Sequence, residues 1–473
     1  MLDIRILRED PERVRADLKK RGRDAAVVDD VREHDRAWRE GLQKMEALRA
    51  ERNKSGKLIA EAKKAGGDAK EILAKMAQLG DELKRLESDV PTAEKTRDGL
   101  LRTIPNLMHP SVPVGRDDSE NVEIRAWGGK PTHAFPAKSH VDLLESLDLA
   151  DLERAARAAG SRFFYLKGDL VMLGRALEFF ALTELSKKGF LPIEPPYLLR
   201  REALEGAIDL ADFESVIYKV EAGGVEVASG PPTDGQQMKQ NKQIAGSPSA
   251  SSAASVPSVD KFGRAREPDL YLIATSEHPI AAMHMGEILE DAKLPLRYAG
   301  VSPCFRKEAG AHGKDSKGIF RVHQFSKVEM FVYCKPEDSW RIHDELIANA
   351  ESLYQKLKIP YRVVNICTGD LGSIAAKKYD IEAWMPAQGA YREVVSCSNC
   401  TDFQARRYNT RSRKNPGDPT EVVHTLNSTA IAVQRTLVAI LENFQQADGS
   451  VLIPEPLRPY LGGRERIVAR PTP

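Results

Sequence analysis

The segment FRKEAGAHGKDSKGIFRVHQFSKVEM, from Phe305 to Met330, places charged residues on both sides of a glycine-rich centre. Two runs near its end, Gly318 to His323 and Lys327 to Tyr333, have the alternation expected of strands. An arginine at the end of a strand, such as Arg306, presents a planar set of donors that suits a phosphate group. The glycines allow a loop to cover a nucleotide, and Phe325 offers a face on which a base can stack. The segment therefore predicts a nucleotide site between a strand and a returning strand.

The sequence around this segment predicts an α+β domain. Further strand candidates are interleaved with helical patterns and lie at Leu270 to Ile273, Tyr361 to Asn365 and Arg392 to Val395. Their order indicates a mainly antiparallel sheet flanked by helices. Between Ala222 and Pro268 the chain is poor in aromatic residues and rich in Ser, Ala, Gly and Pro, which predicts a mobile insertion.

The N-terminal part of the chain predicts a long helical arm. Apolar residues recur at seven-residue spacing from Val31 through Trp38 and Met45, and a second apolar stripe follows the glycine pair Gly66-Gly67. Two such helices joined by a short turn form an antiparallel coiled-coil hairpin, which would project roughly 50 Å at about 1.5 Å per residue. Pro91 interrupts the second stripe and predicts a kink.

The end of the predicted arm is basic. Between positions 52 and 64 the one acidic residue is Glu61, and five residues are basic: Arg52, Lys54, Lys57, Lys63 and Lys64. Such an excess suits phosphate groups of a nucleic acid. A run of charges is also typical of a solvated face, and coiled-coil arms often serve as dimer seams or spacers, so the pattern alone leaves both interpretations open.

Composition narrows the class of protein. The 473 residues have a formal net charge of +1 although 29% of them are charged, so a nucleic-acid surface must be a local patch. Five cysteines are an odd number in a long chain, which favours a reducing compartment over a disulfide framework. The start of the chain is charged and no run of about 18 apolar residues occurs, so we expect a soluble, cytoplasmic protein with no membrane partner.

Three segments in order resemble the motifs of class II aminoacyl-tRNA synthetases. Gly168 to Pro196 is similar to motif 1, the helix and strand that form the dimer in that family. Phe305 to Glu308 with Phe325 and Glu329 resembles motif 2, and LNSTAIAVQRTLVAILENFQ, from Leu426 to Gln445, resembles motif 3. The order of the three motifs makes the resemblance specific.

Other segments resemble the seryl-tRNA synthetases in particular. Thr275-Ser276-Glu277 is similar to the TxE signature of that family, and VSCSNCTDFQARR, from Val395 to Arg407, is similar to its SCSN…DFQARR block. The N-terminal arm and the segment IPNLMHPSVPVG, from Ile104 to Gly115, also resemble that family. The chain departs from the common bacterial motif 3 sequence NGSG at Asn427 to Ala430, where it reads NSTA.

The resemblance implies a division of the chain and a reaction. We expect a tRNA-binding coiled-coil arm at 1–110, a linker at 111–137 and a class II catalytic domain at 138–473, with the insertion at 222–268. We expect an ATP-dependent ligase that activates L-serine as seryl-adenylate and transfers it to the 3′ end of tRNA(Ser), as a homodimer. Use of selenocysteine tRNA as a further acceptor stays open.

The resemblance also implies roles for individual positions. Arg306 and Arg435 would contact phosphate oxygens and act in catalysis, and Glu308 would accept a hydrogen bond from the adenine amino group. ATP binding falls to Arg306, Lys307, Glu308, Phe325, Glu393, Val394, Val395, Ser396 and Arg435. Serine binding falls to Thr275, Ser276, Glu277, Arg306, Glu329 and Thr429. Glu393 and Ser396 match the positions that hold Mg²⁺ with ATP. The residues expected to contact tRNA are Arg52, Lys54, Lys57, Lys63 and Lys64.

Two other functions fit parts of the pattern. A synthetase-like enzyme could activate an amino acid for a carrier protein or another non-tRNA acceptor, and a full arm with a basic tip argues against it. A non-catalytic tRNA-binding scaffold could have arisen by decay of a synthetase, and the intact Arg306, Glu308, Glu393 and Arg435 argue against that.

Overall fold

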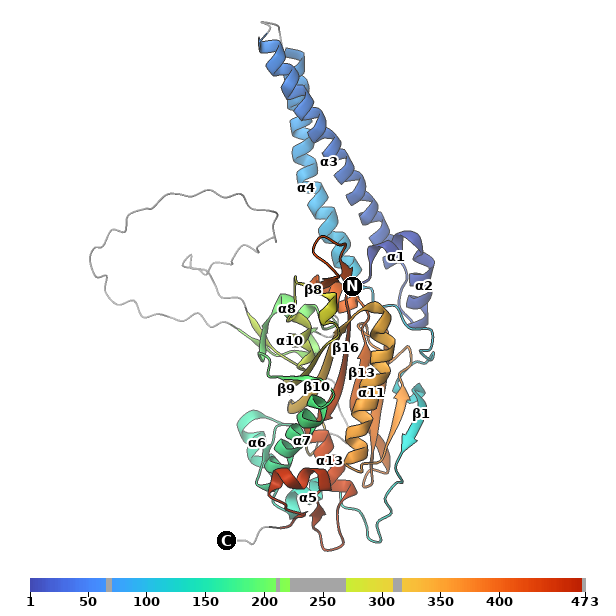
Figure 1. Ribbon diagram of the computed structural model, residues 1–473, viewed down its shortest axis with the longest axis vertical. Coiled ribbons are helices and arrows are strands. Elements are labelled where there is room, and N and C mark those ends of the chain that lie inside the picture. The colour runs from blue at the N-terminus through green and yellow to red at the C-terminus, as the bar shows by residue number, and fades with distance from the viewer. Residues whose placement is uncertain (65–69, 210–212, 222–268, 309–316, 470–473) are drawn as a thin grey trace, which may run out of the picture.

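The protein consists of a long two-helix arm and a domain built around one large sheet (Figure 1). The computed structural model describes residues 1–64, 70–209, 213–221, 269–308 and 317–469. The predicted insertion at 222–268 lies outside the described residues, as do Gly310 and Gly313 of the glycine-rich segment. None of the helices in the described part of the chain has the length and apolar character needed to cross a membrane.

The arm is the antiparallel coiled-coil hairpin expected from the sequence. Its helices are α3 (Val27–Lys64) and α4 (Lys70–Thr103), and α4 continues as a helix through Pro91. The apolar stripes meet in a buried seam made of Met45, Leu48, Leu79, Leu83 and Leu86. Ion pairs join the two helices across this seam, at 2.5 Å for Lys44–Glu82, 3.2 Å for Arg49–Glu87 and 2.6 Å for Lys75–Glu51.

A buried carboxylate organises the base of the arm. The short helices α1 (Ile4–Glu9) and α2 (Pro11–Lys20) pack there through Leu7 and Val14. Asp35, whose side chain is 2% exposed, pairs with Arg8 at 2.7 Å, with Arg39 at 3.0 Å and with Arg97 at 3.7 Å. Because a buried charge needs partners, this cluster fixes how α3 and α4 leave the domain.

The large sheet has eight strands in the order β1-β11-β12-β13-β16-β10-β9-β4. All neighbours are antiparallel except β4 and β9, which are parallel. The strands are β1 (Val122–Trp127), β4 (Leu191–Ile193), β9 (Leu296–Phe305), β10 (Gln324–Cys334), β11 (Tyr361–Asn365), β12 (Lys377–Met385), β13 (Ala390–Asn399) and β16 (His424–Ala432). The expected mainly antiparallel α+β fold is confirmed.

Three helices cover one face of this sheet and leave the other for a pocket. They are α7 (Asp169–Ser186), α11 (Ser339–Lys356) and α13 (Val433–Asn443), and their apolar side chains share one core with the sheet. Side chains alternate along a strand, so Val328 and Met330 of β10 enter this core while Lys327 and Glu329 face the opposite side.

Smaller elements complete the described fold. The remaining helices are α5 (His140–Ser146), α6 (Leu152–Ala159), α8 (Arg201–Glu205), α9 (Phe213–Val216), α10 (Glu277–Ala282) and α12 (Phe403–Tyr408). The remaining strands are β2 (Ala150–Asp151), β3 (Tyr165–Leu166), β5 (Leu198–Arg200), β6 (Lys219–Val220), β7 (Leu270–Leu272), β8 (Ile288–Glu290), β14 (Arg411–Arg413), β15 (Glu421–Val422), β17 (Val451–Leu452) and β18 (Arg466–Ile467).

One predicted strand is wrong. Gly318 to His323 forms bends, and the returning strand begins only at Gln324. Gly318 has φ +85° and lies against His140, where a Cβ would come within 2.1 Å of the imidazole. The N–H of His323 donates to the carbonyl of Arg162 instead of to a strand partner. The segment therefore packs against His140 and bonds to Arg162 before the chain enters the sheet at Gln324.

Part of the range predicted as a linker belongs to the sheet. Strand β1 lies within 111–137 and pairs antiparallel with β11. It forms one edge of the sheet, and the guanidinium of Arg125 pairs with Glu351 of α11 at 2.6 Å. The chain thus joins the large sheet at one edge before residue 138, the first residue predicted for the domain.

Candidate active site

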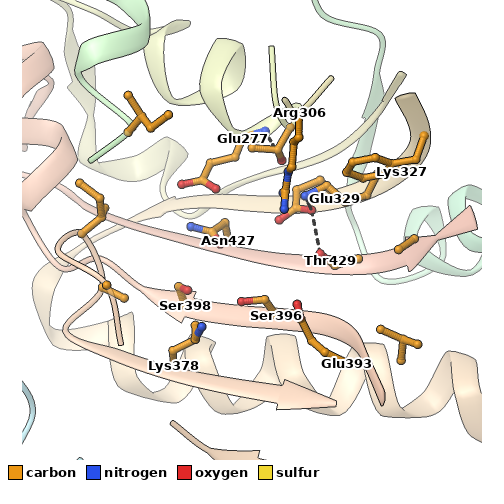
Figure 2. Close-up of a pocket in the computed structure, with 18 of the residues that line it drawn as sticks. Glu277, Arg306, Lys327, Glu329, Lys378, Glu393, Ser396, Ser398, Asn427 and Thr429 are labelled. Atoms are coloured by element: carbon orange, nitrogen blue, oxygen red, sulfur yellow. Dashed lines mark hydrogen bonds and ion pairs between the residues drawn. The ribbon is translucent and has the colours of Figure 1, made fainter. Parts of the chain in front are cut away.

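A pocket of about 460 Å³ lies on the face of the sheet opposite the three helices. Strands β10, β12, β13 and β16 form its floor, and side chains from these neighbouring strands face one space (Figure 2). Its rim includes the start of α10, the end of β9 and the segment 371–375. Motif residues far apart in the sequence therefore meet in one cavity.

One end of the pocket is acidic and rich in hydroxyl groups. Glu329 lies opposite Thr429 in the ladder between β10 and β16, and the Thr429 hydroxyl donates to the Glu329 carboxylate at 3.2 Å (Figure 2). Lys327, two residues earlier on the same face of β10, pairs with Glu329 at 2.8 Å. Glu329 is 2% exposed, so these contacts supply the partners that a buried carboxylate requires.

Glu277 adds a second carboxylate to this end. It begins α10, and Gln404 donates to its Oε1 at 2.8 Å. Burial, together with the neighbouring charge of Glu329, raises the pKa of Glu277 to about 7. A cation bound beside it would favour the ionised form, so this end of the pocket suits an ammonium group.

The other end is basic and aromatic, and Arg306 lies between the two ends, beside Glu277 and Glu329 (Figure 2). Arg306 follows β9 directly, its Nε donates to the Ala274 carbonyl at 3.4 Å, and its guanidinium lies 5.3 Å from the centre of the Phe325 ring. The guanidinium of Arg435, in the first turn of α13, lies 5.1 Å from the centre of the Phe320 ring. Two guanidinium groups beside aromatic rings provide contacts for phosphates and for a base.

An ion pair joins Arg435 to Glu393 on the floor of the pocket. Arg435 contacts the Glu393 carboxylate at 3.1 Å and also donates to the Glu393 backbone carbonyl at 2.9 Å. Partial loss of hydration disfavours the ionised form of Glu393, whose side chain is 47% exposed, but Arg435 and Lys378 outweigh that effect and lower its pKa. On the neighbouring strand, burial raises the pKa of Asp380. Glu393 is therefore the carboxylate held ionised at this end.

Glu393 and Ser396 can serve as ligands of a metal ion only together with other groups. Within the described ranges no cluster of three or more His, Cys, Asp or Glu side chains could hold a metal. One carboxylate and one hydroxyl match the way Mg²⁺ is usually bound in nucleotide sites, where phosphates and water supply the other ligands.

Glu308 lies at the rim of the pocket in a constrained backbone conformation. Its φ is +50°, and its carbonyl accepts from Arg162 at 3.0 Å. Arg321 donates to its carboxylate at 2.6 Å. A base amino group approaching Glu308 would therefore share its carboxylate with Arg321.

Most predicted site residues line the pocket, and three do not. Ser276 is fully buried and its hydroxyl donates to the Gly300 carbonyl at 3.2 Å, which places it behind the wall. Val395 belongs to the hydrophobic core on the helical side of the sheet. Lys307 lies beyond the lining residues, and its backbone N–H donates to Val216.

Several lining residues were not predicted from the sequence. They include Phe320, Lys327, Lys378, Ser398 and Asn427. Ser398 and Asn427 lie two residues from Ser396 and Thr429 on the same strands, so alternation along β13 and β16 could have indicated both. Lys378 comes from β12, a strand that the sequence analysis did not identify.

The N-terminal region holds one wall of the pocket. Arg21, at the end of α2, donates to the Gly372 carbonyl at 2.5 Å. The backbone N–H of Asn106 donates to Ser373 at 2.8 Å, and its side chain donates to the Ile374 carbonyl at 3.0 Å and the Cys400 carbonyl at 2.8 Å. Gly372, Ser373 and Ile374 all line the pocket.

The basic residues of the arm lie far from this pocket, near the outer end of α3 (Figure 1). The side chains of Arg52, Lys54, Lys57 and Lys64 are exposed to solvent. The side chain of Lys63 lies outside the part of the chain that the structure describes.

Family models match both parts of the chain. A model described as the seryl-tRNA synthetase N-terminal domain matches residues 1–108. A model described as the tRNA synthetase class II core domain (G, H, P, S and T) matches residues 261–444. The two matches correspond to the arm with its base and to most of the domain that contains the pocket.

Relatives and solved structures resemble the chain over its full length. A serine–tRNA ligase of Methanocella arvoryzae is 49% identical over 469 residues, which cover 98% of this chain and 100% of the relative. A crystal structure of seryl-tRNA synthetase from Pyrococcus horikoshii complexed with ATP has a TM-score of 0.86 at 48% identity and covers 100% of both chains. A cytoplasmic serine–tRNA ligase from Naegleria fowleri in complex with AMP has a TM-score of 0.81 at 36% identity and covers 100% of this chain and 99% of that chain.

Proposed function

The chain belongs to the seryl-tRNA synthetase family, and from this premise we propose that its pocket activates L-serine with ATP and passes the seryl group to the 3′ end of tRNA(Ser). It is a serine–tRNA ligase, an aminoacyl-tRNA synthetase of class II. The observation that carries the proposal for the pocket is its division into an acidic, hydroxyl-rich end and a basic, aromatic end.

The acidic end suits serine. The ammonium group of serine would pair with Glu277, and the serine hydroxyl would bind at the Glu329–Thr429 pair. Alanine lacks the hydroxyl and would lose its hydrogen bonds to this pair, and a site built to bind a substrate hydroxyl can discriminate by about 10⁴-fold. Threonine must be refused by crowding around its additional methyl group.

The basic end suits ATP. Arg306 and Arg435 would contact phosphate oxygens, and the adenine would stack between Phe325 and Arg435. Glu308 would accept from the adenine amino group. Mg²⁺ bound with ATP would be held by Glu393 and Ser396 and would supply positive charge to the phosphates.

The reaction needs no protein nucleophile; the pocket has to hold serine and ATP in position for each other. The carboxylate of serine attacks the α-phosphorus of ATP, pyrophosphate leaves, and seryl-adenylate forms. Arg306 and Arg435 stabilise the negative charge that develops on the transferring phosphoryl group. The terminal 3′-hydroxyl of the tRNA then attacks the acyl carbon, and AMP leaves.

The arm supplies the grip on tRNA in this proposal. Exposed Arg52, Lys54, Lys57 and Lys64 can contact the phosphates of an RNA helix together with Lys63. The division of labour follows the predicted boundaries, with tRNA binding in 1–110 and catalysis in 138–473, and β1 from between them joins the catalytic sheet. A carrier-protein ligase would have no use for such an arm.

We also propose a homodimer in the cytoplasm. Apolar side chains of α7 and β4 are exposed in the single chain, with Met172 at 53%, Phe179 at 61% and Leu191 at 60%. These residues lie in the segment that resembles motif 1, and a second copy would cover them. All five cysteines are free and buried, which agrees with a reducing compartment.

Amino-acid-dependent exchange of pyrophosphate into ATP, assayed with each of the twenty amino acids, tests the first step. We expect exchange with serine and at most weak exchange with threonine or alanine. Aminoacylation assays with tRNA(Ser) and with selenocysteine tRNA test the second step and its range of acceptors. Exchange with another amino acid would contradict the assignment of the acidic end, and absence of any exchange would favour a scaffold.

A further inference from the structure

Gln404, in α12, is a fully buried amide that links the acidic end of the pocket to strand β16. Its Nε2 donates to Oε1 of Glu277 at 2.8 Å. Its Oε1 accepts from the hydroxyl of Thr425 at 2.7 Å. The chain Thr425–Gln404–Glu277 therefore connects the centre of the sheet to a carboxylate that faces the pocket.

The nitrogen of this amide faces a hydrogen-bond acceptor, Glu277, and its oxygen faces a donor, the Thr425 hydroxyl. When Glu277 is ionised its carboxylate can only accept hydrogen bonds, so the atom of Gln404 that faces it in that state is the nitrogen. The oxygen then faces the Thr425 hydroxyl, which can donate. Thr425 is itself fixed, because its N–H donates to Thr401 at 2.9 Å and its carbonyl accepts from Cys400 at 3.0 Å. The amide thus has one favourable orientation.

The groups around Glu277 have opposing effects on its pKa, and the hydrogen bond from Gln404 is one of those that lower it. Burial raises the pKa of Glu277 to about 7, with a further contribution from Glu329, whereas Lys327, Gln404 and Arg306 act to lower it.

The remaining titratable neighbours carry no charge near neutral pH. Burial lowers the pKa of His278 to about 3 and raises the pKa of the Cys400 thiol and of the Tyr408 phenol. Loss of the hydrogen bond from Gln404 should therefore change the ionised fraction of Glu277 near neutral pH.

We propose that Gln404 is a positioning residue for the amino acid: anchored by Thr425, it keeps the Glu277 carboxylate ionised and aimed at the ammonium group of serine. The inference rests on the proposed function, because it takes the acidic end of the pocket as the serine site. Glutamine fits this position because it is neutral, donates at one end and accepts at the other. Glutamate would place a second carboxylate against Glu277, and methionine would leave both Glu277 and Thr425 without their partner.

The pH dependence of serine activation in the full-length protein tests the proposal. Gln404→Met has nearly the same shape but no donor, so the pKa of Glu277 should rise. The acid limb of the pH profile, where kcat/KM for serine falls as Glu277 becomes protonated, should then move to higher pH by about one unit. In pyrophosphate exchange, kcat/KM for serine should fall about tenfold at about pH 6.5 and recover to within about threefold at about pH 8.5. The KM for ATP should stay within about twofold, because the basic end of the pocket is untouched.

Two variants and one control separate positioning from packing. Thr425→Val removes the anchor and keeps the shape, so it should shift the same limb in the same direction by a smaller amount, and it carries the test if Gln404→Met does not fold. Gln404→Glu should shift the limb further than methionine does. Gln445→Met is a matched control, since Gln445 is 2% exposed and both ends of its amide bond to the backbone of Lys138. It should lower stability without moving the pH profile.

The outcomes are distinct. A fall in kcat/KM for serine that is equal at all pH values, or an equal rise in the KM for ATP, would overturn the positioning role and leave Gln404 as a packing residue. A parent protein that exchanges with serine but shows no acid limb would overturn it as well. A parent protein without serine-dependent exchange would instead refute the proposed function on which the inference rests.

Discussion

At the scale of single residues, the two ends of the pocket treat their carboxylates differently. Arg435 and Lys378 keep Glu393 ionised, whereas burial brings the pKa of Glu277 to about 7. Glu393 can therefore offer a constant negative charge to a bound nucleotide and its cation. Glu277 changes its ionised fraction near neutral pH, so the charge at the serine end depends on what is bound there.

Glu277→Gln should stabilise the fold at alkaline pH while it abolishes serine activation. The pKa of Glu277 is raised from its ordinary value of about 4.3 to about 7. Between these two pH values Glu277 loses its proton more readily in the unfolded chain than in the folded one, so its ionisation favours unfolding. The penalty is complete above about pH 7. The variant should gain about 1–2 kcal/mol in free energy of unfolding at about pH 8 and little at about pH 4.5, measured by urea titration. An equal gain at both pH values would show that the ionised carboxylate is not the cause.

Arg306→Ala should remove a phosphate contact that strengthens as negative charge develops on the transferring group. Serine-dependent pyrophosphate exchange should fall about 10²-fold or more, mainly in kcat. Arg116→Ala is a suitable control, because the Arg116 side chain is 87% exposed and Arg116 lies outside the pocket. Near-normal exchange in Arg306→Ala would remove this residue from the mechanism.

Sequence patterns could identify residues that line the pocket where an ordered motif contains them, among them Arg306, Glu329 and Arg435. They could not separate the two faces of a strand within a motif, which is why Val395 was assigned to the site and lies in the core. Gln404 was inside a recognised block, but its importance depends on Glu277, a residue 127 positions away in the sequence. Such a contact is created only by the fold.

At the scale of elements, the sequence located two strands of the large sheet well and missed others. Tyr361 to Asn365 matches β11 in full, and β10 contains the predicted Lys327 to Tyr333. Strand β16 was not predicted as a strand, because Asn427, Ser428 and Thr429 stand in a row and the alternation of polar and apolar residues is lost. Strand β1 has the opposite pattern, since all of its residues are exposed.

Replacing 222–268 by a short Gly/Ser turn should leave both reaction steps within about threefold of the parent. The two ends of the segment are already close, because β6 and β7 pair antiparallel and Lys219 contacts Asp269 at 2.9 Å. A segment poor in apolar residues contributes little buried surface, so its removal should cost little stability. Loss of serine activation in this variant would show that the segment acts at the pocket.

Neutralising the basic end of the arm should separate the two steps of the reaction. With Lys54, Lys57, Lys63 and Lys64 changed to Gln, pyrophosphate exchange should stay within about twofold, whereas kcat/KM for tRNA should fall by about 10-fold or more at moderate salt. The dependence of tRNA binding on salt should also weaken, because fewer counterions are released.

The same exchange of Lys for Gln at Lys19 and Lys20 provides the control for that experiment. Both residues are exposed, but they lie in α2 at the base of the arm. They should leave tRNA charging nearly unchanged. Full charging by the four-residue variant would show that the arm is a spacer.

At the scale of the whole molecule, the exposed apolar side chains of α7 and β4 predict the dimer. Phe179→Asp should yield monomers in sedimentation velocity and lower activity, since a charge at the centre of a symmetric apolar contact is repeated on both copies. Val114→Asp is the control, because Val114 is 74% exposed and lies outside α7 and β4. A parent protein that sediments as a monomer would contradict the assignment of this surface.

The backbone contacts between the N-terminal region and the wall of the pocket limit how the protein can be recombined. Arg21 and Asn106 hold the segment 371–375, so a chimera joined near residue 110 would combine an arm base and a pocket wall that had not evolved together. A crossover placed beyond Asp35 and Arg97, on the outer part of the coiled coil, would leave those contacts intact. Grafts of foreign tRNA-binding tips should therefore be tolerated there, whereas transplanting the whole N-terminal region should carry a loss of serine affinity with it.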